Sequence, residues 1–95
     1  MKEFSVELAL VFKALGDSTR VKIIELLKIN QSLCGCNLLE YFSITQPTLS
    51  YHMKILVESQ LVVGEKDGSW THYRLNQERM REISGFFEKN EDREE

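Results

Sequence analysis

The sequence predicts a mainly α-helical domain with a small β-hairpin wing, that is, a winged helix-turn-helix. Three observations lead to this fold class. A short apolar segment, a tight connection and a longer amphipathic segment follow one another between residues 36 and 59. Two β-rich runs then flank Asp67 and Gly68, a strong hairpin signal because both residues tolerate a positive φ. Apolar residues at helical spacing precede and follow this unit, so the predicted order is α-α-α-α-β-β-α.

The first two predicted helices span residues 4–15 and 20–30. In the first, the apolar residues recur at the spacing of one helical face: Phe4, Leu8, Val11, Phe12 and Leu15. Gly16 ends this helix in the manner of a C-terminal glycine. Asp17 or Ser18 then supplies the N-cap of the second helix, because a short side-chain oxygen can accept an exposed backbone N–H there.

Residues 36–42 and 47–59 are predicted to form the two helices of the turn motif. Thr45 or Gln46 caps the second of them, and Pro47 lies in its first turn, where a missing backbone N–H costs little. Its apolar positions share one face, which must be buried in the core: Leu49, Met53 and Leu56.

The outer face of this second helix is predicted to contact DNA. It carries mostly polar side chains: Gln46, Pro47, Thr48, Ser50, Tyr51 and Lys54. Glutamine can bond adenine at two points, hydroxyls serve base or phosphate, and the N-terminal half of such a helix enters the major groove. Any surface helix is polar outside, so the helix alone leaves the choice open. The hairpin that follows directly favours DNA.

Three further residues complete the predicted DNA-binding set. His52 lies at the edge of the buried face, so a packed, hydrogen-bonded histidine or a phosphate contact is favoured over a metal ligand. In the hairpin, Lys66 and Arg74 are expected to straddle the phosphate backbone or an adjacent minor groove. Alternation along the second strand places Tyr73 and Leu75 inward. Trp70, near the tip, is interpreted as a packing residue.

The last predicted helix, residues 76–90, keeps an apolar stripe, as does the first. A chain this small cannot bury both stripes by itself, so we expect a homodimer with two-fold symmetry. The expected interface residues are Phe4, Leu8, Val11, Met80, Ile83 and Phe87. Such a dimer places two recognition helices about 34 Å apart, which predicts a pseudo-palindromic operator in double-stranded DNA.

The 95 residues fit a single domain over residues 1–90 followed by an acidic flexible tail, residues 91–95. The net charge of −3 comes from the last fifteen residues, so the body is neutral and the charge neither supports nor excludes DNA binding. No apolar run of about 18 residues predicts a membrane span, and residues 1–10 do not resemble a signal peptide. A cytoplasmic location with reduced thiols is therefore expected.

Other classes of function are less well supported. No paired carboxylates, phosphate loop or Cys-His-acid set is present, so neither an enzyme nor a catalytic cofactor is expected. A protein-interaction module whose fourth helix docks a partner remains an alternative, and it predicts no salt-dependent DNA affinity.

Four segments within residues 5–76 are distinctive: FKALGDSTRVKIIELL, LCGCNLLEYF, TQPTLSYHMKIL and EKDGSWTHYRLN. Together they resemble the ArsR/SmtB family of winged-helix metal-sensing repressors. The C-x-C-x-L element is similar to the arsenic-sensing branch. The resemblance implies a cytoplasmic homodimer, joined through its first and last helices, that leaves its operator when a metal ion binds.

The resemblance also implies that Cys34 and Cys36 are ligands of the inducing ion. Soft thiolates suit As(III) or Sb(III), and other thiophilic metals remain possible. The family's Asp after the second cysteine is Asn37 here, and Leu39 stands where some arsenic sensors have a third cysteine. The last helix has no His, so the zinc site of other branches is absent.

Other roles of the cysteine pair stay open. A disulfide two residues apart closes a small strained ring and is not expected as the resting state of a reduced protein. A redox or reactive-sulfur sensor on the same fold is an alternative, as are two small core residues. On a regular helix the two side chains diverge by about 200°, so ion binding is expected to unwind that turn, which Gly35 makes easy, and to move the next helix.

Overall fold

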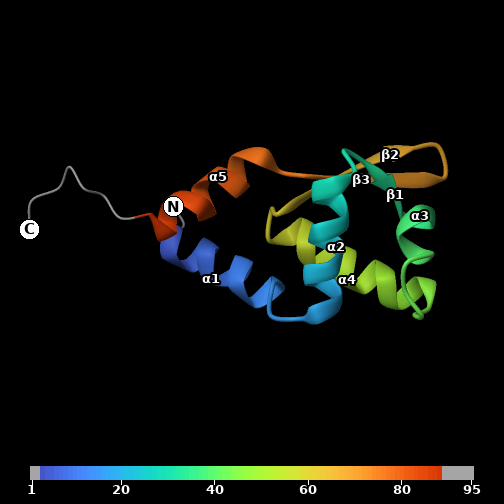
Figure 1. Ribbon diagram of the computed structural model, residues 1–95, viewed down its shortest axis with the longest axis horizontal. Coiled ribbons are helices and arrows are strands. Elements are labelled where there is room, and N and C mark those ends of the chain that lie inside the picture. Colours follow the sequence, from blue (N-terminus) through green and yellow to red (C-terminus); the bar gives the residue numbers. More distant parts are fainter. Residues whose placement is uncertain (1–2, 89–95) are drawn as a thin grey trace, which may run out of the picture.

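The computed structural model describes residues 3–88 and confirms a mainly helical domain with a β-hairpin wing (Figure 1). Its elements run in the order α1, α2, β1, α3, α4, β2, β3, α5. This differs from the predicted order only by the short strand β1. None of the described helices is long and apolar enough to span a membrane. The predicted acidic tail, residues 91–95, lies outside the described residues.

Helices α1 (Phe4–Ala14) and α2 (Ser18–Ile29) form where the apolar spacing predicts them. Asp17 is the N-cap of α2, and its carboxylate accepts the backbone N–H of Arg20 at 3.1 Å. The cap satisfies one of the N–H groups that the start of a helix leaves unpaired.

The turn motif consists of α3 (Gly35–Leu39) and α4 (Gln46–Glu58). Thr45, one of the two predicted caps, accepts the backbone N–H of Thr48 at 3.3 Å, and Pro47 lies in the first turn. The three apolar residues predicted for the inner face of α4 are all buried. They pack in one core with α1, α2, α3 and the base of the hairpin.

The wing is the antiparallel pair β2 (Val62–Asp67) and β3 (Trp70–Leu75). Its register pairs Asp67 with Trp70, so the two-residue turn is Gly68–Ser69. The predicted turn, Asp67 with Gly68, is therefore wrong by one residue. Of the two turn residues, Gly68 takes a positive φ of +68°, which suits a turn with glycine at its first central position.

Strand β1 (Leu33–Cys34) is the element that the sequence did not predict. Leu33 lies opposite Tyr73 and Cys34 opposite His72, so β3 is the central strand of a three-stranded sheet. A strand of two residues is too short to show a period of alternation. It joins the first cysteine directly to the wing.

Helix α5 (Gln77–Phe87) lies beside α1 at the end of the molecule away from the wing (Figure 1). Arg79 of α5 is only 6% exposed and reaches the carboxylate of Glu7 in α1 at 3.5 Å. The same guanidinium pairs with Glu82 at 2.9 Å and donates to the Gln60 side chain at 2.7 Å. This polar contact fixes α5 against α1 and against the segment that follows α4.

Two residues expected in the dimer interface lie instead in the core of the single chain. Leu8 and Val11 are buried at 3% and 0% exposure, because α1 turns this face toward α4. The expectation is corrected for both residues. Met80 and Ile83 are partly buried against the core, whereas Phe4 and Phe87 are exposed.

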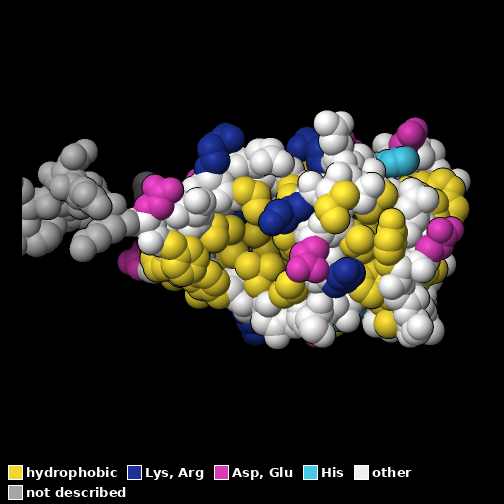
Figure 2. Space-filling view, viewed as in Figure 1, with side chains coloured by type: hydrophobic (Ala, Val, Ile, Leu, Met, Phe, Trp, Pro, Cys, Tyr) yellow, Lys and Arg dark blue, Asp and Glu magenta, His cyan; other side chains and the backbone are white. Residues whose placement is uncertain are grey.

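The exposed apolar surface of the α1–α5 end is larger than the sequence suggested. Figure 2 shows hydrophobic side chains gathered over these two helices. Besides Phe4 and Phe87, the exposed members are Val6, Leu10, Phe12 and Phe86. The rings of Phe12, Phe86 and Phe87 contact one another, with centroids 5.2–6.0 Å apart. We call the three phenylalanines that contact one another, Phe12, Phe86 and Phe87, the aromatic end face.

Candidate nucleic-acid interface and thiol site

The outer face of α4 is exposed to solvent in the single chain. All six residues predicted on that face of the helix are exposed, among them Gln46 and Pro47 in the first turn and Lys54 further along. Tyr51 is 60% exposed. The N-terminal half of α4 therefore presents amide and hydroxyl groups to solvent, and Lys54 presents an ammonium group further along the helix. These groups suit contact with base edges and phosphates.

His52 is a packed histidine, as the sequence favours. Its Nδ1 lies 3.0 Å from Nη1 of Arg20, and the Asp17 carboxylate lies 3.9 Å away. Because arginine can only donate, Nδ1 is the acceptor of the bond from Arg20. Arg20 also donates from Nε to the Ala14 carbonyl at 2.6 Å. This cluster joins the end of α1, the start of α2 and the middle of α4, so His52 positions the recognition helix.

The two wing cations are exposed, but the structure does not bring them together. Lys66 pairs with Thr71 across the hairpin, so it shares a face with Thr71. Arg74 alternates onto the opposite face, and its guanidinium lies 3.7 Å from the carboxylate of Glu65. The two side chains therefore leave the hairpin on opposite faces.

Cys34 and Cys36 are joined by a disulfide in the structure, which contradicts the expectation that the pair would not be bonded. The physical reason is the conformation of Cys34. It is the extended N-cap of α3, with φ −77° and ψ 161°, and the helix begins only at Gly35. The two Cα atoms are 5.2 Å apart, inside the range that a disulfide spans.

The same conformation overturns the expected unwinding of α3. The side chains would diverge only if both cysteines were helical, and Cys34 is not. The two sulfurs already lie together, so they can share one acceptor atom without a change of helix. Within residues 3–88, no group of three or more His, Cys, Asp or Glu side chains is placed to hold a metal ion. Among the described residues, the pair therefore brings two sulfurs together and no third such side chain.

Asn37 supports this geometry. Its backbone N–H donates to Sγ of Cys34 at 3.1 Å, and its side-chain oxygen accepts the backbone N–H of Cys34 at 3.3 Å. These reciprocal bonds form a capping box in which a sulfur replaces the usual hydroxyl. The amide of Asn37 therefore caps the start of α3 and fixes the conformation of Cys34.

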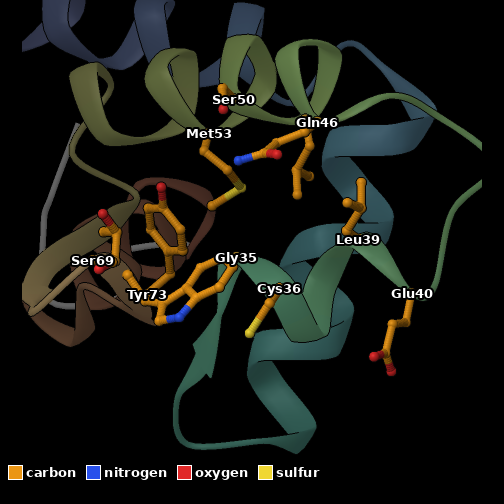
Figure 3. A pocket seen from close by; sticks show the side chains of 12 residues that line it. Gly35, Cys36, Leu39, Glu40, Gln46, Ser50, Met53, Ser69 and Tyr73 are labelled. Carbon is orange, nitrogen blue, oxygen red and sulfur yellow. The ribbon is translucent and has the colours of Figure 1, made fainter.

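A pocket of about 460 Å³ opens beside the second cysteine (Figure 3). Figure 3 shows Met53 and Ser50 of α4 on one side and Cys36 with Gly35 on the other, with Tyr73 of β3 between them. The full lining is Gly35, Cys36, Leu39, Glu40, Gln46, Leu49, Ser50, Met53, Ser69, Trp70, Thr71 and Tyr73. The pocket therefore lies between α3, which carries Cys36, helix α4 and the wing.

Comparison with known proteins identifies the family of this chain. Residues 17–63 match the arsR family of bacterial regulatory proteins. The chain is 50% identical over 70 residues to the arsenical resistance operon repressor of Staphylococcus aureus, covering 74% of this chain and 66% of that protein. It is 47% identical over 72 residues to the repressor of the same name from Staphylococcus xylosus, covering 76% and 68%. The chain belongs to the ArsR family.

Solved structures confirm the fold of this ArsR-family chain. A crystal structure of an ArsR family transcriptional regulator superposes with a TM-score of 0.80 at 21% identity, covering 90% of this chain and 88% of the other. A homodimeric winged helix-turn-helix DNA-binding domain from Mycobacterium bovis superposes with a TM-score of 0.72 at 22% identity, covering 84% and 74%. At these identities the likeness shows the winged helix-turn-helix alone.

Sequence reasoning missed three parts of the site. It did not place Arg20 against His52, although the cap at Asp17 fixes the start of α2 and hence the position of Arg20 three residues later. Sequence reasoning did not predict β1, because a strand of two residues shows no alternation of polar and apolar side chains. It named Trp70 as a packing residue without finding the pocket, which needs three elements in space at once.

Proposed function

We propose that this protein is a homodimeric repressor that binds a pseudo-palindromic operator through α4 and the wing, and that As(III) or Sb(III) at Cys34 and Cys36 releases it. Relatives named arsenical resistance operon repressors support the class of function and of inducer. The same proposal expects a cytoplasmic protein with reduced thiols.

One observation carries the proposal: the thiol pair lies between the two elements that would hold DNA. Cys34 belongs to a strand paired with β3 of the wing, and the next helix, α3, packs against α4. A change in bonding at the two sulfurs therefore acts on both elements. Release requires the ion to bind more tightly to the conformation that does not hold DNA.

The thiols supply the chemistry at this site. When bound, a trivalent metalloid accepts the sulfurs of both cysteines, which must be reduced first. Asn37 holds Cys34 in the extended conformation that directs its sulfur toward Cys36. The local backbone is thus arranged for chelation before any ion arrives, which lowers the ordering cost of binding.

Fluorescence anisotropy on the protein's own upstream DNA tests the proposal. The protein is reduced with a phosphine, and arsenite is titrated at fixed salt, because DNA affinity depends steeply on salt. Tight binding that a stoichiometric amount of arsenite abolishes is the expected result. Cys34→Ser and Cys36→Ser should keep DNA affinity and lose the response. Failure to bind DNA would favour the interaction module instead.

The disulfide in the structure favours one second candidate, a thiol-based redox or reactive-sulfur sensor. In this reading an oxidant joins Cys34 and Cys36, and the oxidised protein leaves DNA. The same assay separates the two: peroxide or a persulfide donor releases DNA and arsenite does not. The Cys→Ser variants should then stay bound to DNA when the oxidant is added. If these variants still released DNA on adding arsenite or the oxidant, both functions of the cysteine pair would be excluded.

A further inference from the structure

The thiol pair leaves a trivalent arsenic atom with one bond unassigned. The whole chain contains only two cysteines, and Leu39 stands at the position of a third. Trivalent arsenic forms three bonds, so two protein sulfurs satisfy two of them. The third substituent must come with the ligand or from solvent.

The space beside Cys36 favours a carbon substituent. The pocket is lined by apolar side chains from three elements: Leu39, Leu49, Met53, Trp70 and Tyr73. Leu49 and Met53 are core residues that form its inner wall, whereas Ser50 and Gln46 are exposed at its mouth. A hydroxyl held against this inner wall would lose hydrogen bonds to water, whereas an alkyl or aryl group would gain from burial.

The size of the pocket matches such a group. Its volume of about 460 Å³ falls within the range of pockets that hold small organic ligands. Aromatic walls on the side of β3 suit a flat ring in offset or edge-on contact. A phenyl group would bury more apolar surface in this pocket than a methyl group would.

We infer that the inducer this site fits best is a trivalent arsenical with one organic substituent, bonded through arsenic to Cys34 and Cys36 and with the substituent in the pocket between α3, α4 and β3. The inference rests on the proposed function and names its ligand class. The reaction balances as R–As(OH)₂ with two thiols giving R–As(S–Cys)₂ and two waters. Two As–O bonds break, two As–S bonds form, and the oxidation state of arsenic is unchanged.

The substituent would also connect binding to DNA release. Gln46 and Ser50 line the pocket and belong to the predicted DNA-contacting face of α4. A group seated there touches the recognition helix directly, in addition to any strain transmitted through β1. Substituents that fill the pocket should therefore release DNA at lower concentration than those that do not.

Binding can be measured without DNA, because Trp70 is the only tryptophan in the chain and lines the pocket. Phosphine-reduced protein is titrated with phenylarsonous acid, methylarsonous acid and arsenite while Trp70 fluorescence is followed. Mass spectrometry of the intact adduct confirms that one R–As unit has replaced two thiol hydrogens. The phenyl compound should bind about tenfold more tightly than the methyl compound, which has the same two exchangeable groups.

Variants at Leu39 locate the substituent. Leu39→Phe narrows the pocket and should bring the phenyl-to-methyl ratio of affinities close to one, while methyl binding persists. Leu39→Ala widens the pocket and should keep the preference. Ile44→Phe, a matched enlargement at a partly buried residue outside the pocket, should leave the ratio unchanged.

The results distinguish this inference from the proposed function. Equal affinities for the phenyl and methyl compounds, or a preference that survives in Leu39→Phe, would overturn the inference. If arsenite alone still released DNA through the two cysteines, the proposed function would stand. If no arsenical bound the reduced thiols, both would fall, and the redox candidate would be left.

Discussion

Exposed aromatic side chains lie at both ends of the molecule, and their chemistry differs. At the α1–α5 end, Phe86 and Phe87 are 53% and 68% exposed and contact the ring of Phe12. Near the tip of the wing, Trp70 is 50% exposed, and Tyr51 on the outer face of α4 also faces solvent. The first group carries no polar atom, whereas Trp and Tyr each carry a hydrogen-bonding group that water satisfies.

This difference indicates two uses of a similar exposed area. A contiguous patch of phenylalanine is unfavourable in water and is expected to be covered by another copy of the chain. An indole and a phenol tolerate water and suit a surface that is covered only part of the time, by DNA or by a ligand. The aromatic end face would thus assemble the protein, and the other end would bind DNA and the inducer.

A charge placed in the aromatic end face should separate these two uses most sharply. Phe86→Glu is expected to give monomers and to lower operator affinity by about a hundredfold, because a monomer loses the second half-site. Analytical ultracentrifugation and anisotropy measure the two effects. Trp70→Glu is the matched control, since the residue it replaces is equally exposed, and it should stay dimeric. A dimeric Phe86→Glu would contradict the assignment of this face.

Two substitutions on α4 should differ in kind. Gln46→Ala should reduce operator affinity by about 1–3 kcal/mol and relax the sequence preference at one base pair, if its amide reads a base edge. Lys54→Ala should weaken binding to all DNA sequences alike. It should also lower the slope of log affinity against log salt concentration by about one, as the loss of one phosphate contact does. Anisotropy on operator and scrambled DNA at several salt concentrations gives both values. If both variants lost affinity uniformly, direct readout by Gln46 would be excluded.

The two ends also differ in how far the sequence predicted them. The approximate bounds of α1, α2 and α4, the caps at Asp17 and Thr45, and the buried face of α4 followed from local spacing and local hydrogen bonds. Helices α3 and α5 end three residues before their predicted ends. These features depend on residues three or four apart, which the sequence shows directly. The interface residues were harder, because an apolar stripe does not reveal which of its members faces the core of its own chain. Leu8 and Val11 were misplaced for this reason.

The thiol site shows the same limit more clearly. The sequence located Cys34 and Cys36 but assumed that both were helical, so it predicted divergent side chains. The pairing of Cys34 with His72 holds the first cysteine extended, and this contact spans 38 residues of sequence that no local pattern covers. The pocket depends on the same long-range pairing. Geometry that comes from tertiary contacts overrides local preference and is not visible in a single sequence.

Arg79 offers a test of what fixes α5 to the rest of the chain. Arg79→Met removes the cation that the carboxylates of Glu7 and Glu82 share, and it should lower the free energy of unfolding by about 1–2 kcal/mol. The value is below that of a fully buried pair because both carboxylates are partly exposed. Urea unfolding measures it. Arg81→Met, at an exposed position of the same helix, should change stability by less than about 0.5 kcal/mol. Equal losses in the two variants would show that the buried cluster contributes no more than surface charge.

The smallest expected change in stability concerns the packing of Tyr73, which lies between the two strands of the wing and the start of α3. The ring of Tyr73 packs over two glycines, Gly64 of β2 and Gly35 at the start of α3. A Cβ at Gly64 would lie 3.1 Å from Cε1 of Tyr73 and 3.3 Å from Cγ2 of Thr71, whereas a Cβ at Gly35 would lie 3.8 Å from Cε2 of Tyr73. The first contact forces the ring to move, and the second is an ordinary van der Waals distance.

Gly64→Ala should therefore lower the free energy of unfolding by about 1 kcal/mol, the lower end of the range for overpacking. Gly35→Ala should change it by less than about 0.5 kcal/mol. Urea unfolding at one temperature compares them, and Trp70 fluorescence reports whether the pocket wall has shifted. Because Tyr73 lines the pocket and lies opposite Leu33 of β1, a shifted ring in Gly64→Ala should also weaken binding of the phenyl arsenical. An unchanged stability in Gly64→Ala would show that the ring of Tyr73 gives way without cost, and the expected loss of binding of the phenyl arsenical would then not follow.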